Sequence, residues 1–171
     1  VVQTYNGFDG SDNVLANQSS TQYKSHATSV SSSALGRLSL LDGTEGQKSL
    51  QGAAINAKLS MAKVFNDQPG PAWSWTAFAN SINWMVNQPQ KAAIINLSLG
   101  SNGFFTDNAL AALKNAINKD TLLTISSGNE GQSQPSWPAA YANAAWANGQ
   151  IIVVGSVDKN NQLSSFSNAA G

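Results

Sequence analysis

The sequence predicts an α/β fold in three layers (αβα), with a mainly parallel β-sheet between two layers of helices. Short apolar segments alternate with longer segments in which apolar residues recur at helical spacing. The short segments are apolar at consecutive positions, which is typical of strands covered on both faces in a parallel sheet. No change of composition divides the 171 residues, so we expect a single domain over residues 1–171.

The alternation is clearest from residue 58 onward. Strands are predicted at 58–65, 92–98, 121–126 and 150–157. Helices are predicted at 74–87, 107–119 and 139–147, the last of them short. Because a helix lies between consecutive strands, we expect parallel strands joined by right-handed crossovers. Three tryptophans lie at the start of and within the first of these helices, and they are predicted to pack in the core or against a partner and not to form a ligand platform. They are Trp73, Trp75 and Trp84.

The first third of the chain has a weaker pattern. Residues 1–5 are compatible with a strand, 9–25 with a polar loop and 27–41 with a helix that has a serine-rich face. A loop rich in glycine and charge, at residues 42–46, precedes the first clear strand.

Charge and composition exclude several classes of function. The 171 residues have 9 basic and 9 acidic side chains, a net charge of zero and 11% charged residues. Nucleic acids and anionic membranes need clustered basic residues, which the sequence lacks, so neither is an expected partner. No apolar segment approaches the roughly 18 residues of a membrane span. Without cysteine and with one histidine, the chain offers no disulfide and no thiolate or multi-histidine metal site.

Two glycine-containing loops follow predicted strands and are candidates for a binding site. They comprise residues 99–103, after the strand at 92–98, and residues 127–131, after the strand at 121–126. Ligands of parallel α/β sheets meet the loops at the carboxyl ends of the strands. Neither the dinucleotide fingerprint nor the phosphate-loop motif occurs in the sequence, so a nucleotide or small-molecule binder is supported only by the fold class.

Several sequence blocks, taken together, resemble the subtilisin-like serine proteases (subtilases). The blocks are residues 25–30, 52–64, 94–100, 125–131, 152–158 and 164–167. Their order and spacing match those of the family, and the resemblance extends over residues 20–171. It implies a subtilisin-like catalytic domain that is incomplete at both ends, and a polypeptide substrate.

The resemblance assigns two catalytic residues to this chain. His26 corresponds to the general base, which takes a proton from the nucleophilic serine and gives it to the leaving amine. Asn129 corresponds to the oxyanion-hole asparagine, whose side-chain amide donates to the tetrahedral intermediate. The block around His26 departs from the family pattern, because Ala27 stands where the family has glycine and Ser29 where it has a second histidine.

Six further residues correspond to the two edges that bind an extended substrate as an added strand. They are Ser98, Leu99, Gly100, Ser126, Ser127 and Gly128. The rigid loop Pro135–Pro138 is expected beside the specificity pocket. Asp42, Glu45 and Asp67 have carboxylates that a structural calcium ion could use, but no metal ligand is assigned, and no cofactor is expected for the chemistry.

Two members of the catalytic triad are missing from the sequence. No Asp-Ser/Thr-Gly motif precedes His26, since Asp9 and Asp12 are in a turn-like segment, and no Gly-Thr-Ser-Met-Ala block follows residue 167. We therefore expect the isolated chain to be inactive. We also expect it to lack the strand that bears the aspartate, which would leave unpaired backbone beside strands 58–65 and 92–98 for the parent chain or another copy to fill.

One rival interpretation comes from another class of function. In it the chain is a protease-derived module that binds or displays peptides without cleaving them, and the departures at Ala27 and Ser29 favour it. The family and a cysteine-free composition rich in Ala, Ser, Asn and Gly together indicate an exported protein, secreted or at the cell surface, of bacterial origin.

Overall fold

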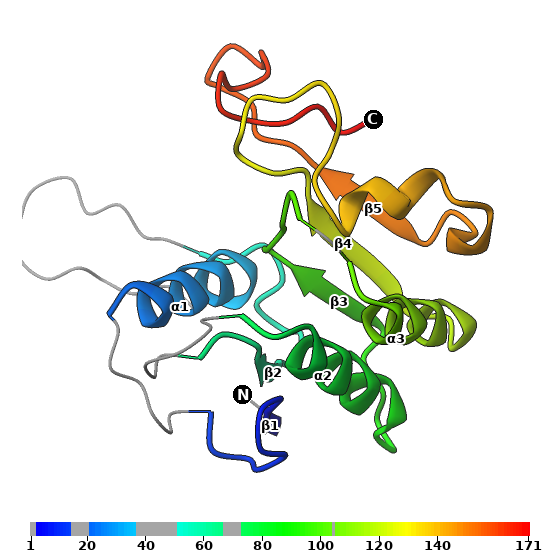
Figure 1. Ribbon diagram of the computed structural model, residues 1–171. Coiled ribbons are helices and arrows are strands. Elements are labelled where there is room, and N and C mark those ends of the chain that lie inside the picture. The colour runs from blue at the N-terminus through cyan, green and yellow to red at the C-terminus, as the bar shows by residue number, and fades with distance from the viewer. Residues whose placement is uncertain (1–2, 15–20, 37–50, 67–72, 104) are drawn as a thin grey trace, which may run out of the picture. The chain divides into compact units, whose positions relative to one another are not determined.

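The computed structural model describes residues 3–14, 21–36, 51–66, 73–103 and 105–171 (Figure 1). Its contacts divide the chain into two compact units, Val1–Ser74 and Trp75–Gly171. Each unit combines parallel strands with at least one helix. The expectation of a single domain concerns the whole chain and stays a prediction.

The first unit contains a two-stranded parallel sheet and one long helix. Strand β1 (Gln3–Asn6) pairs with β2 (Ser60–Lys63) in a register that puts Gln3 opposite Ser60 and Asn6 opposite Lys63. Both strands agree with the segments predicted from the sequence. β1 occupies one edge of β2, and within the described residues no strand pairs with the other edge of β2 or with the edge of β3 away from β4, so the expected unpaired backbone beside segments 58–65 and 92–98 stays a prediction. β1 is rich in polar residues and mostly half-buried, which agrees with its weak pattern in the sequence.

Helix α1 (Thr21–Leu35) begins earlier than the predicted helix at 27–41. It ends because the chain turns at Gly36 and meets segment 52–54, where Gly52 N donates to Gly36 O at 2.7 Å and Ala54 N donates to Ala34 O at 2.7 Å. A Cβ atom on Gly52 would collide with the backbone nitrogen of Gly36, so this close approach requires glycine. Residues 37–41 of the predicted helix lie outside the described residues.

The second unit contains a three-stranded parallel sheet in the order β3-β4-β5. These strands are β3 (Ile94–Leu97), β4 (Leu122–Ser126) and β5 (Ile151–Val154). Helices α2 (Trp75–Asn87) and α3 (Asp107–Asn118) connect into this sheet and pack against each other over one of its faces (Figure 1). All of these elements lie within the segments that the sequence predicts.

The core of the second unit is built from one stripe on each helix and one face of each strand. Its largest members are Phe78, Leu113, Leu123 and Ile125, all of which are fully buried. The opposite face of the sheet has a different environment, since Ile94 is 60% exposed, Ile152 46% and Val154 51%. Within this unit, therefore, the helices cover one face of the strands.

The predicted helix at 139–147 is replaced by two short 3₁₀ helices, η1 (Ala139–Asn143) and η2 (Ala145–Ala147). Ala144 separates them because its backbone is extended, at φ −72° and ψ 138°. The alanine-rich composition indicated a helix, but the tighter turns bring Tyr141 and Trp146 into ring contact with a centroid distance of 5.3 Å.

Candidate active site

The site is built where β3 and β4 end, because parallel strands present their carboxyl ends at one edge of the sheet. Strand β4 ends at Ser126, and β3 is followed directly by Ser98, Leu99 and Gly100. The hydroxyl of Ser126 donates to the carbonyl oxygen of Leu99 at 3.3 Å. The two segments that were predicted to form the edges of a substrate-binding site therefore lie next to each other.

A third segment, Pro135–Pro138, is bound to both of them. The backbone groups of Ser101 and Trp137 form a reciprocal pair, with Ser101 N donating to Trp137 O at 2.9 Å and Trp137 N donating to Ser101 O at 3.0 Å. Ser136 donates twice to the carbonyl oxygen of Ser127, from its backbone nitrogen at 2.8 Å and from its hydroxyl at 3.1 Å. The loop predicted to lie beside a specificity pocket is therefore part of the same edge.

The glycines in these segments leave room for close contacts. Gly128 has φ +113°, and a Cβ atom there would collide with the side-chain nitrogen of Asn168 and lie 2.6 Å from a carboxylate oxygen of Glu130. A Cβ atom on Gly100 would lie 2.6 Å from the hydroxyl of Ser136. Gly128 requires glycine because of its φ and its crowded polar neighbours, whereas at Gly100 a side chain would have to displace the Ser136 hydroxyl.

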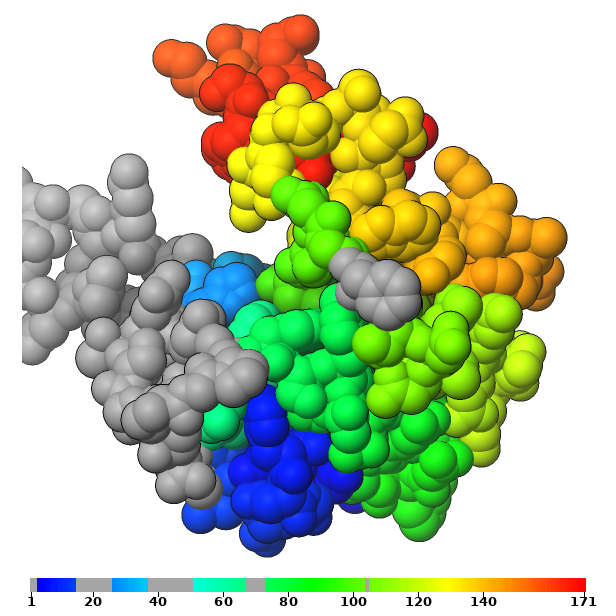
Figure 2. Space-filling view, viewed as in Figure 1, coloured from blue at the N-terminus to red at the C-terminus, as the bar shows by residue number. Residues whose placement is uncertain are grey.

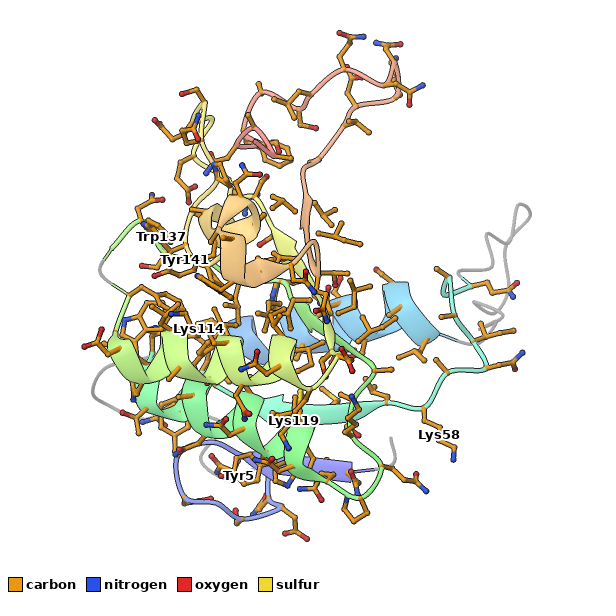
Figure 3. All side chains as sticks on the ribbon, turned by 90° about the vertical axis from the view of Figure 1, so that its right-hand side faces the viewer. Tyr5, Lys58, Lys114, Lys119, Trp137 and Tyr141 are labelled. Carbon is orange, nitrogen blue, oxygen red and sulfur yellow. The ribbon has the colours of Figure 1, made fainter. Side chains whose placement is uncertain are left out.

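An aromatic cluster supports the loop at Pro135–Pro138. Trp137, which is 36% exposed, contacts Tyr141 with a centroid distance of 4.6 Å, and Figure 3 shows the two rings next to each other. Tyr141 also contacts Phe105, which contacts Trp75 at 4.5 Å, so Trp75 packs as the sequence predicted. Burial raises the pKa of the Tyr141 hydroxyl, and the nearby charge of Asp107 raises it further. Tyr141 is therefore a neutral packing residue at physiological pH.

Asn129 lies at the surface, in the loop that leaves β4. Its backbone nitrogen donates to the Glu130 carboxylate at 3.0 Å, while its side-chain amide has no hydrogen bond with any residue in the described part of the chain. The loop itself is held by the C-terminal segment, and the two lie side by side in Figures 1 and 2, in yellow and red. An exposed amide on a fixed loop can donate to a ligand without first breaking an internal bond.

His26 belongs to the first compact unit, whereas the other predicted site residues belong to the second. It lies in the second turn of α1 and its side chain is exposed. Ala27 and Ser29, which depart from the family pattern, are in the same helix. The predicted start of the helix at residue 27 was wrong, because α1 begins at Thr21.

The end of β1 explains why Asp9 is a poor match for a catalytic aspartate. Its carboxylate accepts hydrogen bonds from the side chain of Asn6 at 3.1 Å and the backbone nitrogen of Ser11 at 2.9 Å. Hydrogen bonds from Ser11 hold the pKa of Asp9 below its ordinary value, mainly the bond from its backbone nitrogen. Asp9 therefore closes a turn after β1.

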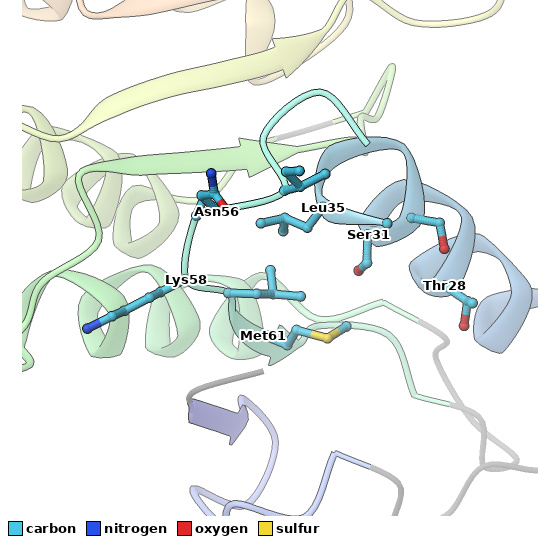
Figure 4. A pocket seen from close by; sticks show the side chains of 11 residues that line it. Thr28, Ser31, Leu35, Asn56, Lys58 and Met61 are labelled. Carbon is cyan, nitrogen blue, oxygen red and sulfur yellow. The ribbon is translucent and has the colours of Figure 1, made fainter. Parts of the chain in front are cut away.

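The first unit also contains a pocket, of about 590 Å³, between α1 and the segment that leads into β2 (Figure 4). It is lined by apolar side chains such as Leu35, Ile55 and Met61 together with the hydroxyls of Thr28 and Ser31. No residue predicted for catalysis or substrate binding lines it. Its polar groups are hydroxyls, the Asn56 amide and Lys58, which gives it no evident catalytic chemistry.

Within the described residues, no group of three or more His, Cys, Asp or Glu side chains is arranged to bind a metal. The carboxylates considered for calcium, Asp42, Glu45 and Asp67, all lie outside those residues. None of the helices that the structure describes is both long enough and apolar enough to cross a bilayer.

Sequence reasoning missed the residues that hold the site in place. Asn168, Ser167 and Ser136 are all buried and polar, and each forms hydrogen bonds with residues of the β4 loop or of the strand ends. Asn168 follows directly after the block at 164–167 that carried the family resemblance. That position was the available signal, but a sequence does not show which buried polar side chains meet across the fold.

Comparison with known proteins identifies the family. The model of the subtilase family, Peptidase_S8, matches residues 3–170, and this chain belongs to that family. The resemblance read from the sequence begins at residue 20, whereas the family match begins at residue 3 and so includes β1.

Curated relatives are bacterial proteases. The chain is 31% identical to thermitase of Thermoactinomyces vulgaris over 162 residues, which is 94% of this chain and 50% of thermitase. It is 33% identical to the major intracellular serine protease of Bacillus subtilis (strain 168), covering 87% of this chain and 43% of the relative. The chain thus spans half, or less, of the length of these relatives.

Solved structures confirm the three-layer α/β fold. The protease domain of PatA, solved as a variant, superposes with a TM-score of 0.63 at 23% identity, covering 81% of this chain and 45% of that one. The prenylagaramide maturation protease PagA superposes with a TM-score of 0.56 at 24% identity, covering 70% of this chain and 40% of the other. At these identities the similarity concerns the fold.

Proposed function

We propose that this chain provides the general base and the oxyanion donor of a serine endopeptidase. Membership in the subtilase family supports the reaction class, which is hydrolysis of a peptide bond. The observation that carries the proposal is the exposed Asn129 amide on a loop fixed beside the ends of β3 and β4. In this assignment His26 transfers the proton and Asn129 stabilises the charge that develops on the scissile carbonyl oxygen.

The substrate would be an extended polypeptide bound between segments 98–100 and 126–128. The hydrogen bond from Ser126 to Leu99 supports this placement, because it fixes the two segments side by side. Small side chains there allow a substrate backbone to come within hydrogen-bonding distance, as in strand addition. No cofactor is needed for this chemistry, and a structural calcium ion would have no catalytic part.

The chain alone is expected to be inactive. Its 171 residues include neither an Asp-Ser/Thr-Gly motif before His26 nor a Gly-Thr-Ser motif. Removing triad members leaves only the residual catalysis that substrate binding and the oxyanion hole provide. Bacterial relatives support a bacterial origin, and the cysteine-free composition supports an exported protein.

A serine-reactive phosphonate tests the proposal most directly. In a form of the protein long enough to include a Gly-Thr-Ser block, the serine oxygen should bond to phosphorus as phenoxide leaves, and mass spectrometry should detect the adduct. The 171-residue chain should remain unlabelled. Labelling of this chain would show that it has its own nucleophile. Absence of labelling in the longer form would favour a non-catalytic peptide-binding module, the second candidate, which the departures at Ala27 and Ser29 support.

Asn129→Leu tests the oxyanion role within the longer, active form. We expect kcat to fall by about 10²–10³ while KM stays within about threefold, because the donor acts on charge that exists only in the transition state. The magnitude is one measured on a subtilisin and is not calculated for this chain. Asn118→Leu, at an exposed position on α3, is the matched control. A rise in KM with unchanged kcat would remove Asn129 from this role.

A further inference from the structure

The buried side chain of Asn168 is the centre of the hydrogen bonds that hold the β4 loop. Asn168 is 1% exposed, and its amide uses all of its donors and acceptors. Its nitrogen donates to Ser127 O at 3.1 Å and to the Glu130 carboxylate at 2.8 Å. Its oxygen accepts from Glu130 N at 3.0 Å and from Gln132 N at 2.9 Å. Four bonds from one side chain therefore connect three residues of the loop.

The loop is shaped around this side chain. Gly128 has φ +113°, and a Cβ atom there would collide with the Asn168 nitrogen. The backbone of Asn168 contributes too, because its nitrogen donates to Gly128 O at 3.1 Å and its oxygen accepts from the Ser127 hydroxyl at 2.9 Å. Asn168 thus satisfies polar groups that irregular backbone would otherwise bury unpaired.

Asn129 is connected to this centre through Glu130. One carboxylate oxygen of Glu130 accepts two hydrogen bonds. The backbone nitrogen of Asn129 donates one at 3.0 Å, and the side-chain nitrogen of Asn168 donates the other at 2.8 Å. The residues on both sides of Asn129 are bonded to Asn168, through Gly128 O and Glu130 N. The backbone of Asn129 is therefore restrained, while its side chain remains exposed.

We propose that Asn168 is a positioning residue for Asn129, acting through this arrangement of Ser127, Glu130 and Gln132, which we call the Asn168 clamp. The inference deepens the proposed function and rests on it for the catalytic part of its consequences. Asn168 does not itself touch the substrate, because it is buried beneath the loop. It fixes the backbone from which Asn129 presents its amide.

Besides the bond from Asn168 N to Gly128 O, two backbone hydrogen bonds join the loop to the C-terminal segment, and all three would remain without the Asn168 side chain. Gly131 N donates to Phe166 O at 2.8 Å, and Ala169 N donates to Gln132 O at 2.9 Å. Both restrain the far end of the loop at residues 131 and 132. The clamp reaches further back, to Glu130 and Ser127, on either side of Asn129. Losing the side chain should therefore release Glu130, which follows Asn129, while the backbone bond at Gly128 O remains.

Amide hydrogen exchange in the 171-residue chain tests the clamp without any activity assay. Asn168→Ala should accelerate exchange at Glu130 and Gln132 by about tenfold or more, because both amides lose their acceptor. Exchange at Leu123 and Ile125, in the interior of β4, should change by less than about threefold. Asn118→Ala, an exposed asparagine on α3, is the matched control and should change neither group. Unchanged protection of Glu130 and Gln132 would overturn the proposal.

A second variant keeps this test decisive if Asn168→Ala does not fold. Glu130 is exposed, so Glu130→Ala should fold, and it removes the acceptor shared by Asn129 N and Asn168. We expect faster exchange at Asn129 by about tenfold or more, with Gln132 still protected by Asn168. Unchanged exchange at Asn129 would contradict the connection through Glu130.

Kinetics in the longer, active form separate positioning from a merely structural role. Asn168→Ala should lower kcat by about tenfold or more and leave KM within about threefold. Added to Asn129→Leu, it should lower kcat by no more than about twofold further, since the residue that it positions is already gone. Equal losses in both backgrounds would show a structural role only. If the longer form has no protease activity, the proposed function fails, while the exchange data still decide whether Asn168 fixes the Asn129 loop.

Discussion

Asn129 and Asn168 carry the same amide group, one exposed on the β4 loop and the other buried beneath it. The buried amide has four hydrogen bonds to the loop, so it contributes order and is not available to a ligand. The backbone nitrogen of Asn129 donates to Glu130, whereas its exposed side-chain amide has no hydrogen-bond partner within the described part of the chain. Environment, rather than residue type, therefore separates an amide that is open to a ligand from one whose hydrogen bonds are all used within the protein.

The sequence suggests a role for one of these two asparagines. Asn129 was identified from Gly128-Asn129-Glu130-Gly131, a short motif whose residues are neighbours in the chain. Asn168 could not be assigned in this way, because its partners lie about forty residues earlier and no periodicity connects them. Long-range hydrogen bonds between single polar side chains leave no pattern in the sequence.

Gly128 gives a prediction at the residue scale. Gly128→Ala should lower the free energy of unfolding by more than about 2 kcal/mol, because it combines a left-handed backbone with collisions at Asn168 and Glu130. Gly149→Ala is the matched control, since Gly149 has φ +69° but nothing within 4 Å of the added atom. It should cost only the backbone strain of about 1–2 kcal/mol. Urea unfolding of both variants measures the difference, and equal losses would mean that the loop yields to a methyl group.

In the turn that follows β5, the side chain of Asp158 holds the backbone in place. The Asp158 carboxylate accepts from Asn160 N at 2.7 Å and from Gln162 N at 3.0 Å, and Asp158 N donates to Gln162 O at 2.8 Å. These bonds bring Val157 and Leu163 together as an antiparallel bridge. The sequence predicted this polar turn at 158–162, because aspartate and asparagine form such bonds with nearby backbone.

The same carboxylate gives a pH prediction. Hydrogen bonds from Gln162 and then Asn160 hold the pKa of Asp158 below its ordinary value. The ionised form is thus favoured in the folded chain, so its stabilising contribution is complete above the unfolded pKa and disappears as pH falls through the lower folded pKa. Carboxyl carbon NMR should give a midpoint below 3.8. A midpoint at or above that value would contradict the bonded turn. Asp158→Asn should remove this part of the acid dependence.

The spacing of apolar residues predicted the bounds of some helices well and of others poorly. Helices α2 and α3 agree with their predicted ranges because each has an apolar stripe that packs in the core. Segment 139–147 has no such stripe, and its alanines supply propensity alone. Contacts among Tyr141, Trp146 and Trp137 accompany two short 3₁₀ helices there instead. Helix α1 has a serine-rich surface, so its bounds were also predicted poorly.

At the scale of the whole molecule, the three-stranded sheet has two unlike faces. One face lies against α2 and α3, whereas the other presents Ile94, Ile152 and Val154 with about half or more of each residue exposed. Adjacent residues of β5 therefore have opposite environments, although Ile151 and Ile152 are the same residue type.

This difference predicts unequal responses to the same substitution. Ile151→Thr should lower the free energy of unfolding by about 2–3 kcal/mol, because it removes apolar contacts and buries a hydroxyl. Ile152→Thr should change it by less than about 1 kcal/mol, since threonine is well tolerated on an exposed strand surface. Thermal or urea unfolding compares the two, and binding of a hydrophobic dye should fall only for Ile152→Thr. Equal destabilisation would show that residue 152 is covered in solution.

The sequence by itself determined the α/β alternation, the approximate positions of most strands and helices, and the motifs that indicated the subtilase family. These features depend on local periodicity and on neighbouring residues, which a sequence displays directly. Tertiary structure decided the pairing of β1 with β2, the exposed face of the β3-β4-β5 sheet and the Asn168 clamp. Each of these depends on groups that are distant in the chain and meet across the fold. A buried polar group without a hydrogen bond costs free energy, so the arrangement in which every buried polar group has a partner is favoured over others.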